Sequence, residues 1–158
     1  MNQRALVVLL LGGAFIPLTT ALPLLSDLPL AVSFTQVALA SSPLAPSLQG
    51  KPVLVVIYAS WCTTCQKMKP VLKTIRQQEG NDVHWVQFDV STSAASKRSA
   101  ARAKELGLGQ FFKSHRSQTS LVSILNPATG ASIRTFRAQT DIDPYVSAIR
   151  TTRSLIRR

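Results

Sequence analysis

One short segment, in which the hydrophobic pattern changes from that of a strand to that of a helix, constrains this chain most. Residues 53–58 are an unbroken run of β-branched and apolar side chains, which is the pattern of a strand buried on both faces of a parallel sheet. Beyond Trp61 apolar side chains recur at helical spacing, on Met68, Val71, Leu72 and Ile75. We therefore predict a helix over about 62–78, kinked by Pro70 within it.

Both cysteines of the chain, Cys62 and Cys65, lie at this strand-to-helix junction, within Trp-Cys-Thr-Thr-Cys. A thiol in the first turn of a helix faces unpaired N–H groups and the positive end of the helix dipole, and both favour the thiolate. We assign Cys62 as the attacking thiol and Cys65, one turn further in, as the thiol that resolves a mixed disulfide. Two cysteines exclude a scaffold of several disulfides and a Cys₄ zinc site within one chain, and we predict neither a metal site nor a cofactor.

The rest of the chain predicts alternating strands and helices, followed by a hairpin. Strands are expected at 83–90, 120–125 and 131–137, a helix at 91–106 that ends at Gly107, and a loop at 108–118 with Phe111 and Phe112 in the core. A last helix is expected to be capped by Asp141 or Asp143. The order β-α-β-α-β-β-α indicates an α/β fold with a central mixed four-stranded sheet flanked by helices.

The first forty residues are typical of a targeting segment. Arg4 precedes an uninterrupted apolar stretch from Ala5 to Ile16, and Ala38-Leu39-Ala40 offers a cleavage site, so residues 1–40 are predicted to be a signal peptide. A membrane anchor is the alternative, because residues 5–25 carry no charge and about 20 such residues cross a bilayer. Residues 41–51, rich in proline and serine, are predicted to be a linker, and 52–158 the folded domain.

The net charge of +11 belongs to the predicted domain, because residues 1–40 contain one base and one acid. A basic surface can suit nucleic acid, an anionic membrane or an acidic partner. The bases are scattered, however, apart from a modest cluster at the carboxyl terminus, and no run alternates them with aromatic residues. We therefore predict a solvated cationic surface and no nucleic-acid partner.

The stretch from Val53 to Pro70, with its Trp-Cys-Thr-Thr-Cys and a proline five residues after Cys65, resembles the thioredoxin family. The resemblance extends over the order of elements from about residue 51 to 150. It implies a thioredoxin-like fold and an enzyme that reduces or exchanges disulfides in client proteins. With an export segment, the chain is similar to membrane-tethered reductases of the periplasm or thylakoid lumen, which implies an upstream dithiol or membrane electron donor.

Two positions near the cysteines depart from the family pattern. Val56 stands where thioredoxins carry a buried aspartate, six residues before the first cysteine, so no acid is expected beneath the site. Thr119 stands where the family places a proline before its third strand, and with Trp61 it is our candidate for contacting substrate.

Two other functions share these features. A disulfide-forming oxidase can have the same fold, because the direction of exchange depends on how strongly the fold stabilises the reduced thiolate. A non-enzymatic metal or iron–sulfur module can use the same cysteines, although four thiolate ligands would require a dimer.

Overall fold

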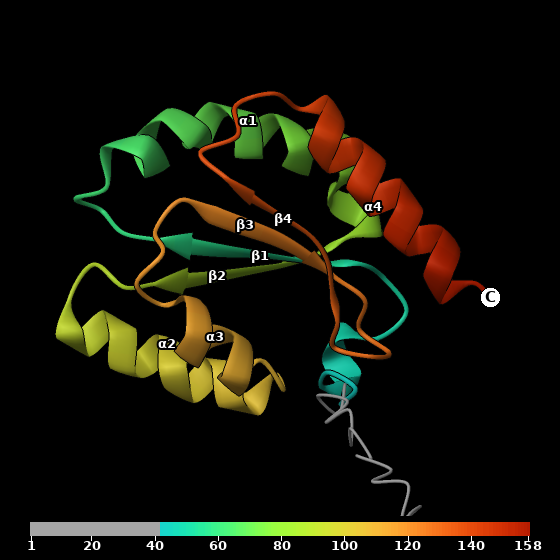
Figure 1. The fold of residues 1–158 in the computed structure, drawn as a ribbon, viewed down its shortest axis with the longest axis horizontal. Coiled ribbons are helices and arrows are strands. Elements are labelled where there is room, and N and C mark those ends of the chain that lie inside the picture. Colours follow the sequence, from blue (N-terminus) through green and yellow to red (C-terminus); the bar gives the residue numbers. More distant parts are fainter. Residues whose placement is uncertain (1–41) are drawn as a thin grey trace, which may run out of the picture. The chain divides into compact units, whose positions relative to one another are not determined.

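The computed structural model describes residues 42–158, so the predicted signal peptide or anchor over 1–40 lies outside the described residues. The elements follow the predicted alternation (Figure 1). They are η1 (Pro46–Leu48), β1 (Val53–Tyr58), α1 (Thr63–Glu79), η2 (Gly80–Asp82), β2 (His84–Asp89), α2 (Ser93–Glu105), α3 (Gly109–His115), β3 (Leu121–Leu125), β4 (Ser132–Arg137) and α4 (Asp143–Ile156). No helix within this range is long and apolar enough to cross a bilayer.

The four strands form one mixed sheet in the order β2-β1-β3-β4. β1 runs parallel to β2, with Val56 opposite Gln87, and antiparallel to β3, with Val56 opposite Val122. β3 and β4 form the predicted antiparallel hairpin. The thioredoxin-like α/β fold with a four-stranded mixed sheet is therefore confirmed.

Helices cover both faces of the sheet, α1 and α4 on one and α2 and α3 on the other (Figure 1). β1 is a central strand of the sheet. As predicted it is buried on both faces, because all of its side chains except that of Tyr58 are buried. On the first face Met68 and Ile75 of α1 pack with Ile149 of α4, so the predicted apolar stripe of α1 faces the sheet.

The predicted loop at 108–118 is wrong, because residues 109–115 form the helix α3. Phe112 is buried as expected and meets Phe88 of β2 edge to face, with ring centroids 5.1 Å apart. Gly107 ends α2 as predicted, with a φ of +75° that favours glycine. A Cβ at Gly107 would lie 3.2 Å from the Cα of Leu44, so this glycine also permits a close backbone approach.

The predicted cap of the last helix is also wrong. Ile142 occupies the cap position of α4 without any side-chain hydrogen bond, and Asp143 is the first helical residue. Pro144 in the first turn has no N–H that needs a cap, and Tyr145 N bonds to the carbonyl of Ile142 at 3.0 Å. The acidic side chain of Asp143 still lies at the positive end of the helix dipole.

Residues 43–48, from the segment predicted to be a linker, pack against the domain. Leu44 and Leu48 are buried in the core cluster beneath α2 and α3. The amide of Leu44 donates to the carbonyl of Pro127 at 2.9 Å, and that of Ala45 to the carbonyl of Leu106 at 3.1 Å.

Candidate active site

Cys62 caps the amino terminus of α1. Its Sγ accepts a hydrogen bond from the backbone N–H of Cys65 at 3.2 Å, the position at which a serine or aspartate oxygen caps other helices. Its own amide donates to the carbonyl of Ala59 at 3.2 Å, which fixes the turn between β1 and α1. The sulfur is therefore held at the helix terminus, as the sequence predicts.

The environment of Cys62 favours its thiolate. Burial, the largest single influence, would raise the pKa of this thiol, since the residue is only 9% exposed. Hydrogen bonds from the side chains of Cys65 and Thr119 and from the backbone N–H groups of Cys65 and Thr64 act in the opposite direction. Together they outweigh burial, so the pKa of Cys62 lies below the ordinary thiol value.

Cys65 has the opposite character. Burial raises the pKa of this thiol, and the hydrogen bond and negative charge of Cys62 raise it further. Hydrogen bonding to the backbone at Ala59 and Ser120 opposes this rise without cancelling it. Both cysteines are free thiols in this structure. The pair therefore combines a thiol whose pKa is lowered with a neighbour whose pKa is raised.

Thr119 is brought to Cys62 by the loop that enters β3. The next residue, Ser120, has a φ of +64°, and its amide donates to the carbonyl of Ile57 in β1 at 3.0 Å. This left-handed residue turns the chain next to the end of β1 and leaves the half-buried Thr119 side chain in hydrogen-bonding reach of the Cys62 sulfur. The predicted site residues Cys62, Cys65 and Thr119 thus lie together.

Trp61, the fourth predicted site residue, points outward and is 66% exposed. Its indole Nε1 donates to the carbonyl oxygen of Ser91 at 3.0 Å, and Ser91 Oγ accepts the amide of Ser60 at 2.7 Å. Asp89 in turn accepts hydrogen bonds from the amide (2.8 Å) and the hydroxyl of Ser91. The loop before the cysteines is therefore fastened to the loop after β2.

The sequence alone did not predict these hydrogen bonds of Asp89 and Ser91. It places Asp89 only within the predicted strand 83–90, and Ser91 at the start of the predicted helix 91–106. The signal was available in principle, because β1 and β2 are parallel neighbours and the segments after their carboxyl ends meet at one edge of the sheet.

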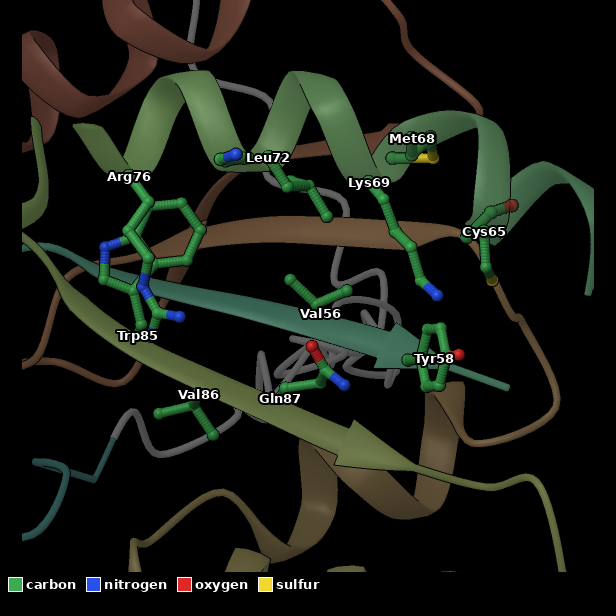
Figure 2. Close-up of a pocket in the computed structure, with 12 residues that line it drawn as sticks. Val56, Tyr58, Cys65, Met68, Lys69, Leu72, Arg76, Trp85, Val86 and Gln87 are labelled. Carbon is green, nitrogen blue, oxygen red and sulfur yellow. The ribbon is translucent and has the colours of Figure 1, made fainter. Parts of the chain in front are cut away.

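A cavity of about 480 Å³ lies behind Cys65, between α1 and the sheet. Figure 2 shows Val56 on the sheet below α1, with Cys65 and Tyr58 at one end and Trp85 at the other. No aspartate or glutamate lines this cavity, so its walls contain no acid that could lie beneath the cysteines. Within residues 42–158 we find no group of three or more His, Cys, Asp or Glu side chains arranged to hold a metal ion.

Comparison with known proteins links this site to one family. The family model described as Thioredoxin matches residues 39–104. The Thiol:disulfide interchange protein TxlA homolog of Synechocystis is 40% identical over 52 residues, which cover 32% of this chain and 29% of that protein. Thioredoxin of Mycobacterium tuberculosis is 37% identical over 49 residues, which cover 31% of this chain and 42% of that protein.

The chain spans less than half the length of these curated relatives. Among solved structures, Trxlp from Edwardsiella tarda aligns with a TM-score of 0.45 and 21% identity over 68% of this chain and 96% of that one.

Proposed function

We propose that this chain is a thiol–disulfide oxidoreductase that reduces or exchanges protein disulfides through Cys62 and Cys65, because residues 39–104 match the Thioredoxin family model. The observation that carries the proposal is the opposite perturbation of the two thiols. The pKa of Cys62 is lowered at the helix terminus, whereas that of Cys65 is raised behind it. Only the thiolate attacks a disulfide, so this difference supports Cys62 as the sulfur that attacks first.

In the first step the Cys62 thiolate attacks one sulfur of a client disulfide. A bond forms between Cys62 Sγ and that sulfur, the client S–S bond breaks, and the other client sulfur leaves as a thiolate. In the second step Cys65 gives up its proton and attacks Cys62 Sγ. The second client sulfur also leaves as a thiolate, the Cys62–Cys65 disulfide remains, and the client has gained two electrons together with at most the one proton that Cys65 released.

The proton of Cys65 has no carboxylate to receive it in the cavity behind it. We infer that the departing client thiolate or water takes this proton. The rate of the second step then depends on the leaving group as well as on the pKa of Cys65.

Client proteins and a reducing partner complete the proposal. Trp61 offers an exposed apolar ring one residue before the attacking sulfur, and the Thr119 side chain is within hydrogen-bonding reach of that sulfur. We propose that a client segment lies between them. Regeneration requires an upstream dithiol, which is oxidised as the Cys62–Cys65 disulfide is reduced.

We further propose that the domain works outside the cytoplasm, in the periplasm or thylakoid lumen. The uncharged stretch at 5–25 and the predicted cleavage site at Ala38–Ala40 support export, either as a cleaved protein or as one anchored by 5–25. Protease protection of the full chain in fractionated cells tests this proposal, and full digestion only after lysis of the cytoplasm would contradict it.

Single-cysteine variants of the full chain test the enzyme. Cys62→Ser should abolish the protein's acceleration of insulin reduction by dithiothreitol, whereas Cys65→Ser should accumulate mixed disulfides visible on non-reducing gels. Thr63→Ser, at an exposed position between them, is the matched control and should retain the rate. If both cysteine variants keep full activity, the proposal is wrong.

The reduction potential of the pair decides the direction of exchange. A potential near the thioredoxin figure of about −270 mV indicates a reductant, whereas one near about −120 mV indicates a disulfide-forming oxidase.

A further inference from the structure

The cavity behind Cys65 is an elongated trough with an aromatic ring at each end. In the β1–β2 register Trp85 stands opposite Leu54, Gln87 opposite Val56, and Asp89 opposite Tyr58. Tyr58 and the strand position of Trp85 are therefore four residues apart, or ~13 Å along the strands. Figure 2 shows the two rings at opposite ends, with Val56 between them and Leu72 of α1 above.

Three cations of α1 line this trough. Lys69, Lys73 and Arg76 are spaced i, i+4 and i+7, so they share one face of the helix. Lys69 Nζ lies 5.6 Å from the ring centroid of Tyr58, and Arg76 Cζ lies 5.2 Å from that of Trp85. The outer two cations therefore sit over the two rings.

No carboxylate balances these charges. The trough walls contain no acidic residue, and the ion pairs formed within residues 42–158 join Arg153 to Glu79 and Asp82. Like charges at i, i+4 on a helix repel and destabilise it. The three cations are exposed and line one wall of the cavity, and a bound anion would relieve their mutual repulsion.

We propose that this trough binds an elongated organic anion with an apolar body. The volume of about 480 Å³ lies within the range of small-ligand sites. Val56, Met68 and Leu72 supply apolar contact for the body, and the cations of α1 fix the acid group. A medium-chain carboxylate matches both the length of the trough and its charge, whereas inorganic anions lack the body and neutral lipids lack the charge.

The position of Cys65 gives such binding a consequence for the thiol. Cys65 forms part of the trough wall, so an occupant covers this thiol. An anion held there also disfavours ionisation of this thiol, because like charges repel. Occupancy therefore slows reactions of Cys65 by shielding it and by keeping it protonated.

Binding can be measured by the fluorescence of Trp85, which is the only tryptophan left in the full-length Trp61→Phe variant. Octanoate should change this fluorescence saturably, and 1-octanol and acetate should need at least tenfold higher concentrations. Lys73→Gln should weaken octanoate binding about five- to tenfold, whereas Lys97→Gln, an exposed lysine of α2, should leave it unchanged. Equal binding of octanoate and 1-octanol, or equal effects of the two lysine variants, overturns the proposal.

Alkylation of Cys65 gives a second readout. In the full-length Cys62→Ser variant, saturating octanoate should slow the reaction of Cys65 with iodoacetamide at least threefold, and acetate should not. An unchanged rate at saturation overturns the placement of the ligand beside Cys65. Neither measurement involves disulfide exchange, so failure here leaves the proposed oxidoreductase activity untouched, and loss of that activity leaves this site untouched.

Discussion

The indole Nε1 of Trp61 donates a 3.0 Å hydrogen bond to the carbonyl oxygen of Ser91, and this bond joins the loop that precedes the cysteines to the loop that follows β2. The Ser91 hydroxyl strengthens the connection by accepting the Ser60 amide and donating to Asp89. The exposed ring of Trp61 is thereby held in one orientation although most of its surface faces solvent.

Replacing Ser91 with alanine should loosen this connection. The variant loses the 2.7 Å bond from the Ser60 amide and the contact with Asp89, so we expect a loss of about 1 kcal/mol in the free energy of unfolding. Trp61 should become more accessible to acrylamide quenching, measured in a Trp85→Phe background. Ser93→Ala, at an exposed position in the first turn of α2, is the control. Equal quenching in the two variants would show that the Ser91 hydroxyl does not hold the ring.

Replacing Thr119 with valine should raise the pKa of Cys62. The Thr119 side chain donates a hydrogen bond that lowers this pKa, and valine has a similar shape without the hydroxyl. The pH midpoint for alkylation of Cys62, followed by mass spectrometry of the labelled peptide, should therefore move upward. If the Thr119 hydrogen bond stabilises the thiolate by about 1.4 kcal/mol, its loss should raise the midpoint by one pH unit. Thr119→Ser keeps a hydroxyl and should keep the midpoint; a shift of the same size in both variants would assign the effect to packing.

The position of Cys62 at a helix terminus could be predicted from the sequence because local patterns determine it. The switch from the β1 run to the α1 stripe places Cys62 at the helix terminus without reference to the rest of the chain. Thr119 was reached only through the family resemblance, since its contact with Cys62 joins segments 57 residues apart. The hydrogen bonds of Asp89 and Ser91 were not predicted for the same reason, because they depend on how two loops meet in space.

α3 escaped prediction because its stability comes from tertiary packing. The helix has only seven residues, and Leu108 at its cap position makes no side-chain hydrogen bond. Isolated helices of this length are marginal in water. Phe112 of α3 is held by its contact with Phe88 across the core, and neither the length nor the capping pattern of the segment indicates that contact.

An acid introduced at Val56 should accelerate the second step of exchange. Val56 is 6% exposed and lines the same cavity as Cys65, so the carboxyl of Val56→Asp would be desolvated and its pKa raised towards neutrality. Such a group can accept the Cys65 proton. With Ellman's disulfide in stopped flow, release of the second thionitrobenzoate should become faster in the variant.

Val56→Asn is the control for this prediction, because asparagine has nearly the shape of aspartate but its side chain cannot act as a base. Both variants bury a polar group and should lose about 1–3 kcal/mol in the free energy of unfolding. The second phase should quicken only in Val56→Asp, and only above the pKa of its carboxyl. A faster second phase in both variants would mean that loosened packing, rather than proton transfer, limits the step.

Leu44 and Leu48 should contribute to stability as core residues do, although they lie in the segment that the proline pattern predicts to be a linker. They are 4% and 6% exposed, and Leu44 is tied to the carbonyl of Pro127 through its amide. Leu44→Ala and Leu48→Ala in the full chain should each cost about 2–5 kcal/mol, measured by urea unfolding. Leu155→Ala removes the same atoms at a position that is 41% exposed and should cost far less. Equal losses at all three positions would show that residues 42–48 do not belong to the folded unit, because a linker leucine and a surface leucine then behave alike.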